Sequence, residues 1–422
     1  MNAPALPLDQ LRLANGLTVL LHHSPDSPVV AVEVMYHVGS KNEQPGLTGL
    51  AHLFEHMMFK GSEHVRDGEH FRRLQEIGAE VNGSTTEDRT NYYEVLPPNQ
   101  LETALFLEAD RMGRLLPALT EHKLQNQRDV VKNERRQSYE NQPYGLAQET
   151  LSAALFPAGH PYSWPVIGSM RDLDTTTLDD LRKFFRQFYA PGNAVVTIGG
   201  QFDPPQARAL VEKYFGDIPA EQSPHAPVFP SWECAPAQHV LLHDNVALPR
   251  VYLVWRSAAW FTDDDIILDV ATDILGAGKN SRLHKALVIE KQLAQSVSAY
   301  QHGLECDGKL VVVATARQGV RPPDLIAALR EQVDGFLAHG ISPRELQKSL
   351  NINESALVLG LDAVRDRVHK LSLFHTLTGS ALNVNRYFER FKNLDPRNVR
   401  ERTAAYLECE PVILEILPQE VS

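Results

Sequence analysis

The sequence predicts an α+β fold built from two similar domains, and three observations support this prediction. Predicted strands occur in pairs joined by hairpin-like turns, and the helices come in blocks, a pattern typical of mainly antiparallel sheets. A proline-rich segment over residues 218–237 indicates an extended linker between residues 1–217 and 238–422. Both halves also begin with the same succession of strands and a helix.

The first half begins with two predicted strands that meet at the turn signal Asn15-Gly16. A third strand over 29–36 shows alternating apolar side chains, and helix 47–60 has apolar residues at helical spacing. The same patterns predict strands over 11–15, 17–22, 80–82, 90–96 and 194–199, and helices over 68–77, 98–116, 120–141 and 178–188.

The second half begins with predicted strands over 239–244 and 250–256, followed by a helix over 263–275. When this helix is superimposed on helix 47–60, His52 falls on Asp269 and His56 falls on Asp273. This is a weak sign of duplication, and it implies that only the first half retains the histidines.

Composition excludes several classes of protein. Among 422 residues, 43% are hydrophobic and 22% are charged, which is typical of globular chains and not of disordered ones. The net charge is −12 and no basic patch occurs, so we expect no nucleic-acid partner. No apolar run approaches the roughly 18 residues of a membrane span.

The N-terminus and the cysteines bear on the compartment. The first residues lack a secretory signal, which favours the cytoplasm, although a periplasmic chain whose signal has been removed would look the same. The three cysteines are odd in number and far apart, so we expect buried thiols rather than a disulfide.

The strongest chemical signal is the segment His52-Leu53-Phe54-Glu55-His56. Histidines at i and i+4 share one face of a helix, so both imidazoles can reach a single ion. Glu55 can approach a metal-bound water without being a ligand, as in the inverzincin pattern H-x-x-E-H. The pattern alone also fits a histidine pair that binds no metal. The best third ligand is Glu134, although for this residue taken alone the ordinary expectation is a solvated helix glutamate paired with Lys132 or Arg135.

Further stretches accompany this motif: Gly78–Thr85, Thr90–Tyr93, Val130–Arg136, His160–Tyr162 and Ser281–Leu283. Together they resemble the M16 (pitrilysin) family of zinc metallopeptidases over nearly the whole chain. The resemblance implies two homologous α/β domains with a LuxS-metallohydrolase-like fold and mainly antiparallel sheets flanked by helices. It also implies one Zn²⁺ per chain on His52, His56 and Glu134, with Glu55 as the general base.

The resemblance also predicts a substrate-binding edge strand. In the family, such a strand beside the metal pairs with the peptide backbone. Here the strand would carry Asn82, Gly83, Ser84 and Thr85. An interior strand is the alternative.

Two departures from the family pattern are informative. Gln127 stands where many relatives have a second glutamate, so it either supports the site by hydrogen bonding but not by charge, or is simply a polar helix residue. Val288 and Gln295 stand where catalytically complete members carry an arginine and a tyrosine. We therefore expect a heterodimer in which a homologous M16 subunit supplies that pair, with a homodimer as the alternative.

The predicted function is a zinc-dependent endopeptidase acting on short or unfolded peptides. A non-catalytic scaffold or partner subunit is the main alternative, because such copies occur in the family. A metal-storage or metal-sensing protein is a third class, which would not require Glu55.

Overall fold

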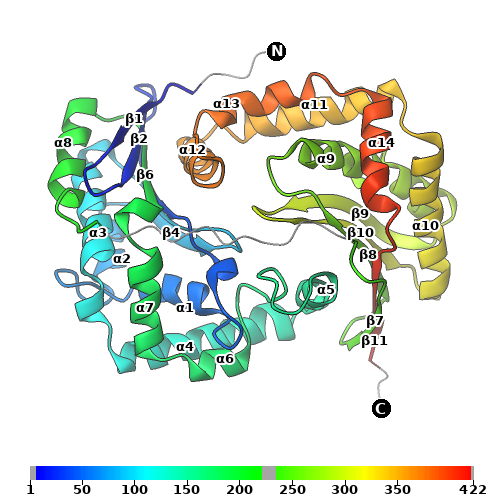
Figure 1. Ribbon diagram of the computed structural model, residues 1–422, viewed down its shortest axis with the longest axis horizontal. Helices are drawn as coiled ribbons and strands as arrows, with labels where there is room; N and C mark the ends of the chain where they lie inside the picture. Colours follow the sequence, from blue (N-terminus) through cyan, green and yellow to red (C-terminus); the bar gives the residue numbers. More distant parts are fainter. Residues whose placement is uncertain (1–5, 221–233, 420–422) are drawn as a thin grey trace. The chain divides into compact units, whose positions relative to one another are not determined.

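The computed structural model describes residues 6–220 and 234–419 (Figure 1). They form two compact units. The first comprises residues 6–134, 164–220 and 356–387, and the second comprises residues 135–163, 234–355 and 388–419. A single division at 218–237 would assign 135–163 and 356–387 to the opposite halves. Residues 221–233 of that segment lie outside the described residues, so the boundary stays a prediction.

The first unit contains a six-stranded sheet in the order β1-β2-β6-β3-β5-β4. These strands are β1 (Asp9–Arg12), β2 (Thr18–His23), β3 (Val30–Tyr36), β4 (Glu80–Thr85), β5 (Thr90–Leu96) and β6 (Ala194–Gly200). Only β2 and β6 pair in parallel. Every residue of β3 and β6 is buried, whereas β4 lies at the edge of the sheet.

Helices cover both faces of this sheet. They are α1 (Leu50–Met57), α2 (Glu69–Glu76), α3 (Leu101–Arg114), α4 (Glu121–Arg135), α6 (Met170–Thr175), α7 (Leu178–Phe188), α8 (Pro204–Phe215), α12 (Val364–Thr378) and α13 (Asn383–Tyr387). Helix α1 contacts β4, and α12 contacts β3 and β6 (Figure 1). Val364 and Val368 of α12 pack on Ala31, which places α12 on the sheet face that bears odd-numbered β3 residues.

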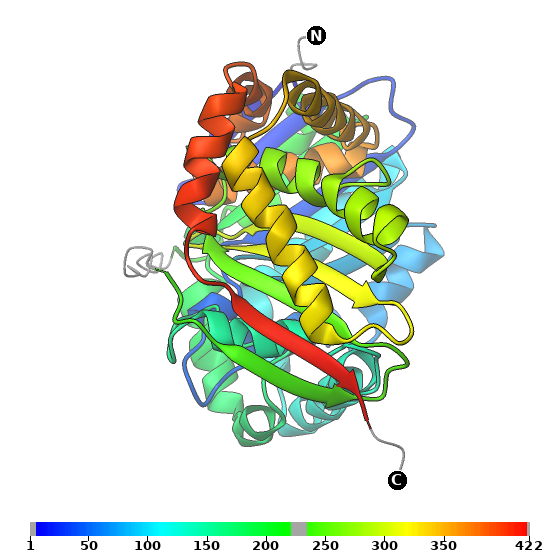
Figure 2. The same ribbon diagram turned by 90° about the vertical axis from the view of Figure 1, so that its right-hand side faces the viewer.

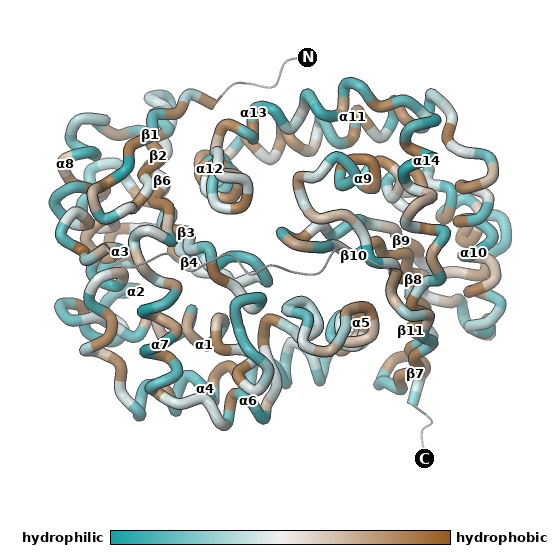
Figure 3. Tube along the Cα trace, in the orientation of Figure 1, coloured by the Kyte–Doolittle hydropathy of each residue, from teal (hydrophilic) through white to brown (hydrophobic). Residues whose placement is uncertain are grey.

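The second unit contains a five-stranded sheet in the order β7-β11-β8-β10-β9. Its strands are β7 (His239–Asp244), β8 (Arg250–Ser257), β9 (Ala294–Gly303), β10 (Gly308–Ala316) and β11 (Val412–Pro418). Its helices are α5 (Ala147–Leu155), α9 (Asp263–Gly276), α10 (Pro322–His339), α11 (Pro343–Leu359) and α14 (Pro396–Leu407). Figure 2 shows α10 and α14 lying over this sheet, and Figure 3 shows hydrophobic residues along β8.

The two sheets share one topology, which confirms the expected repetition. The order β2-β6-β3-β5-β4 in the first unit matches β7-β11-β8-β10-β9 in the second, with one parallel pair at the corresponding place. Helix α1 follows β3, and α9 follows β8. In both units this helix contacts the edge strand, β4 or β9. Edge strand β9 is therefore the counterpart of β4.

Most predicted elements of the first half are confirmed, with shifted ends. β5 and α7 have the expected bounds. The helix expected over 98–116 is instead a 3-10 turn, Pro98–Gln100, followed by α3. The helix expected over 120–141 changes after Arg135 into a π-helical segment, Arg136–Glu140. Among the described residues, no helix is long and apolar enough to span a membrane.

The expectation that the cysteines form no disulfide is wrong. Cys234 and Cys409 are bonded, with Cα atoms 5.8 Å apart. The reason is topological: β7 and β11 are parallel neighbours, with His239 beside Ile413. Residues that precede these two strands therefore meet at the same end of the sheet, although 175 positions separate the cysteines.

Breaking this disulfide is expected to destabilise the protein. Cys409→Ser should lower the free energy of unfolding by roughly 2–5 kcal/mol, because the bond closes a loop of 175 residues in the unfolded chain. Thermal melts should show the same loss for wild type in reducing agent. The matched control is Cys306→Ser, outside the bond, which should melt near wild type. A wild-type melting temperature that does not respond to reduction would contradict this prediction.

Candidate metal centre

Helix α1 is fixed at its start by a buried carboxylate. Glu43 Oε2 accepts a hydrogen bond from the Gly49 amide (2.9 Å), and Oε1 accepts one from the Ala51 amide (2.7 Å). Both amides belong to the first turn, where backbone donors lack partners within the helix. Gly49 adopts φ +87°, and a Cβ there would lie 2.6 Å from the Ile167 carbonyl oxygen, so this position requires glycine.

The apolar face of α1 anchors the helix in the first unit. Leu53, Phe54 and Met57 are fully buried. The ring of Phe54 packs against Tyr189, with centroids 4.4 Å apart. This packing leaves His52 and His56 together on another face, where their ring centroids are 4.8 Å apart.

Helix α4 brings Glu134 to the two histidines. Glu134 Oε1 lies 3.8 Å from His52 Nε2, and Oε2 lies 3.4 Å from His56 Nε2. One ligand atom from each residue can be chosen so that all lie within 4.8 Å of one another. Ligands about 2.0–2.2 Å from one tetrahedral ion are roughly 3.3–3.6 Å apart. The donor set therefore fits a zinc ion with little rearrangement.

Protonation also suits metal binding. Burial is the main cause that lowers the pKa of His52 to about 4, and the neighbouring His56 acts in the same direction. The main cause that lowers the pKa of Glu134 is the hydrogen bond between Glu134 and His56. At neutral pH, His52 is therefore a neutral imidazole and Glu134 a carboxylate, as coordination requires.

Glu55 is buried beside these residues and is held by a single side-chain hydrogen bond. Its Oε2 accepts from Thr85 Oγ1 at 2.6 Å. Burial raises the pKa of Glu55, and the Thr85 hydroxyl opposes this shift by stabilising the carboxylate. A carboxylate with a raised pKa is better matched to accepting a proton near neutral pH.

Removing the Thr85 hydroxyl should therefore change the pH dependence of any reaction in which Glu55 is the base. In Thr85→Val the pKa of Glu55 rises further, so the carboxylate becomes protonated at a higher pH than in wild type. The acidic limb of the pH–rate profile should shift upwards, while Thr85→Ser, which keeps the hydroxyl, should leave it in place. Identical acidic limbs for the valine and serine variants would contradict this role for Thr85.

The predicted substrate-binding residues all lie on edge strand β4. Gly83 and Thr85 face α1 and Glu55, whereas Asn82 and Ser84 face the opposite side of the sheet, as strand alternation requires. A Cβ on Gly83 would lie 3.2 Å from Glu55 Oε1, so glycine leaves room beside the carboxylate. One side of β4 pairs with β5, and its other side has no strand neighbour among the described residues.

The remaining predicted residues lie farther from this cluster. Gln127 is buried on α4, two turns before Glu134, and its side chain forms no hydrogen bond with the described part of the chain. Its expected support of the site stays a prediction. Val288 lies in a π-helical segment, His284–Glu290, and Gln295 is exposed on β9, both in the second unit.

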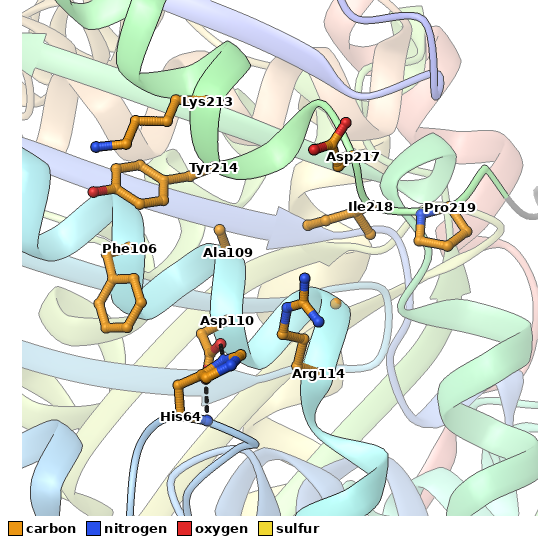
Figure 4. A pocket seen from close by; sticks show the side chains of 11 residues that line it. His64, Phe106, Ala109, Asp110, Arg114, Lys213, Tyr214, Asp217, Ile218 and Pro219 are labelled. Atoms are coloured by element: carbon orange, nitrogen blue, oxygen red, sulfur yellow. Dashed lines mark hydrogen bonds and ion pairs between the residues drawn. The ribbon is translucent and has the colours of Figure 1, made fainter.

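Two features of the first unit were not expected from the sequence. His70, Glu94 and Glu108 form a second buried cluster with ligand atoms within 4.8 Å of one another. Arg111 is hydrogen-bonded to Glu108 there and lies 3.6 Å from Glu94, so a guanidinium already supplies the positive charge. A cavity of about 500 Å³ lies elsewhere, and Figure 4 shows His64 and Asp110 in its wall. His64 Nδ1 and Asp110 Oδ1 lie 2.7 Å apart. The cavity includes none of the predicted site residues.

Comparison with known proteins identifies the family. Residues 18–165 match the family described as "Insulinase (Peptidase family M16)", and residues 175–353 match "Peptidase M16 inactive domain". The zinc protease PqqE of Helicobacter pylori is 30% identical over 352 residues, covering 82% of this chain and 78% of its own. A probable mitochondrial-processing peptidase subunit beta of Arabidopsis thaliana is 23% identical, covering 94% of this chain and 75% of its own.

A solved structure agrees with the sequence relatives. The crystal structure of a protease from Helicobacter pylori superposes with a TM-score of 0.88 at 26% identity, covering 98% of this chain and all of that one. The two-unit fold, the two matched domains and the 30%-identical relative lead to the same conclusion. This chain belongs to peptidase family M16.

Proposed function

We propose that the chain is a zinc-dependent endopeptidase that hydrolyses short or unfolded peptides. The observation that carries this proposal is the convergence of His52, His56 and Glu134, with the buried carboxylate of Glu55 beside them. A scaffold needs none of these residues, and a metal store needs no Glu55. The zinc proteases among the relatives support the same activity.

Each group has a distinct role in this proposal. When bound by the two histidines and Glu134, zinc would supply a Lewis acid and lower the pKa of a coordinated water towards about 7. Glu55 accepts the proton of the attacking water and then donates it to the leaving amine. The hydroxyl of Thr85 holds Glu55 in position through its 2.6 Å hydrogen bond.

Strand β4 favours extended substrates. A peptide that adds to its open edge would pair through backbone amides and carbonyls, independently of sequence. Such pairing requires a segment free of its own secondary structure. Short or unfolded peptides meet this condition, and the backbone of a folded protein does not.

Removal of the metal is the direct test. Incubation with a chelator should abolish cleavage of a mixed peptide library, and added Zn²⁺ should restore it, with products identified by mass spectrometry. A chain that binds zinc and cleaves no member of the library, alone or with a homologous subunit, would support the scaffold alternative.

We further propose a second, homologous subunit and an oxidising compartment such as the periplasm. The subunit is supported by Val288 and Gln295 and by the relative named as a subunit beta. The compartment is supported by the Cys234–Cys409 disulfide, since such bonds persist mainly where thiols are not kept reduced.

A further inference from the structure

A second pocket lies behind edge strand β4, on the sheet face opposite Glu55. It has a volume of about 260 Å³ and is lined by β3, β4, β5 and α12. Ser84, Asn91 and Glu33 contribute from the three strands, and His369 contributes from α12. Arg89, in the turn between β4 and β5, completes the wall. All these residues belong to the first unit.

Apart from Arg89, each charged group of this pocket contacts a carboxylate, a guanidinium or an imidazole. Glu33 is buried and lies 2.9 Å from His369 Nδ1. Arg365 forms ion pairs with Glu80 (3.0 Å) and with the adjacent Asp366 (3.1 Å). Arg89 forms no ion pair with any carboxylate in the described part of the chain.

The hydrogen bonds of Arg89 leave most of its guanidinium available. Nη1 donates to the Ser84 carbonyl (2.8 Å), to Ser84 Oγ (2.6 Å) and to Asn91 Oδ1 (2.7 Å). Nε and Nη2 have no hydrogen-bond partner among the described residues. The bonds through Nη1 hold the side chain over Ser84, and the other two nitrogens remain to bind an anion. A planar guanidinium suits a carboxylate, which it can bind through two parallel hydrogen bonds.

Nearby acids do not neutralise this guanidinium by direct contact. Asp88, next to Arg89, lies 3.2 Å from the Lys41 ammonium. Glu33 Oε1 contacts His369 Nδ1 and accepts a hydrogen bond from Asn91 Nδ2, and Glu33 Oε2 has no hydrogen-bond partner among the described residues. Among the described residues, Arg89 is therefore a cation in the wall of this pocket that contacts no carboxylate.

The position of Arg89 relates it to a peptide on β4. A strand added to the open edge would place one side chain beside Ser84 on the same face, at a Cβ separation of about 4.5–5.5 Å. Because Ser84 Oγ contacts Arg89 Nη1, an aspartate or glutamate there would reach the guanidinium. Gly83 and Thr85 face Glu55 on the other side of the sheet, so the side chain beside Ser84 belongs to a residue at or next to the cleaved bond.

We propose that Arg89 is a specificity-determining residue that binds a carboxylate of the substrate near the cleaved bond. This inference rests on the proposed peptidase function and on pairing of the substrate with β4. The carboxylate comes either from an acidic side chain or from the C-terminus of a peptide. In both cases the neutral analogue, glutamine or a C-terminal amide, should bind less well.

Matched peptides test the proposal. For amidated peptides that differ only by glutamate or glutamine at each position flanking the cleaved bond, wild type should prefer glutamate at one position by roughly tenfold or more in kcat/KM. Arg89→Gln should reduce this ratio to near one, and Arg89→Glu should favour lysine there instead. Arg365→Gln, in the same pocket but paired with Glu80 and Asp366, should keep the wild-type ratio. A free C-terminus paired with its amide tests the second source in the same way.

The ratio separates recognition from folding, because a destabilised hairpin would slow cleavage of both peptides alike. Peptide affinities in the Glu55→Gln background supply a readout that needs no catalysis and should show the same preference. Three results would overturn the assignment of Arg89. Wild type could cleave acidic and neutral peptides equally well, the preference for the acidic peptide could persist in Arg89→Gln, or it could be lost in Arg365→Gln. In those outcomes cleavage itself persists, whereas loss of the proposed function would appear as no cleavage by wild type at all.

Discussion

Glu55→Gln is expected to reduce peptide hydrolysis by about 10²–10⁴-fold while the zinc content stays near wild type. The amide keeps the shape of the carboxylate and can still accept the Thr85 hydrogen bond, but it cannot take a proton from water. Glu55 is not one of the three residues whose ligand atoms converge. Activity on a fluorogenic peptide and metal content should therefore respond independently.

Glu134→Gln is the matched control, since it changes the same chemical group at a ligand position. Loss of groups that merely orient ligands weakens metal binding by about 10–100-fold, so loss of the ligand itself should weaken it by more. The Glu134→Gln variant should therefore lose both zinc and activity, whereas the Glu55→Gln variant should lose activity alone. The opposite ranking of zinc contents would mean that ligand and base have been exchanged, and full activity of Glu55→Gln would eliminate the peptidase mechanism.

The local parts of this site could be predicted because they depend on one helix. The spacing of His52 and His56 places both imidazoles on one face of the helix, wherever the helix lies. Because the face that carries Phe54 is buried in the core, the histidine face is left free of it. The edge hairpin formed by residues 82–85 and 90–96 was expected from the sequence, whereas its pairing with a substrate was expected only through the family resemblance. The structure agrees on the position of β4 at the edge of the sheet and on its contact with α1.

The parts that could not be predicted depend on contacts between distant segments. Cys234 and Cys409 meet because two parallel strands are neighbours, a pairing that no spacing in the sequence reveals. His369 reaches Glu33 because α12 returns to the first sheet after most of the second unit has been formed. Among the described residues Arg89 forms no ion pair, and this too could not be expected from the sequence, where Glu87 and Asp88 stand directly before it.

Peptide hydrolysis by the isolated chain is expected to be about 10²–10³-fold slower than hydrolysis by the chain with a homologous subunit. Hydrolysis develops negative charge on the carbonyl oxygen, and losing one donor to that oxygen typically costs this factor. By resemblance, Val288 and Gln295 replace the arginine and tyrosine that hold substrate and oxyanion. A valine cannot donate such a bond, and Gln295 offers an amide N–H in place of the phenol O–H.

The competing explanation is a donor within the same chain, and the second unit contains one candidate. Arg317 Nη2 donates to the carbonyl of Val288 (3.3 Å), and Nη1 donates to Gln292 Oε1 (3.1 Å). A guanidinium therefore lies next to Val288, which by resemblance corresponds to the family's arginine. Arg317→Gln separates the two explanations, because it should abolish activity only if Arg317 serves in place of a subunit.

The chain should be purified alone and assayed with and without a homologue encoded near its gene, preferably one that lacks the histidines and retains the arginine and tyrosine. Strong activation by that homologue is the expected result. Near-full activity of the wild-type chain alone would contradict the heterodimer proposal. If Arg317→Gln then abolished that activity, Arg317 would be the residue that supplies the positive charge of the family's arginine.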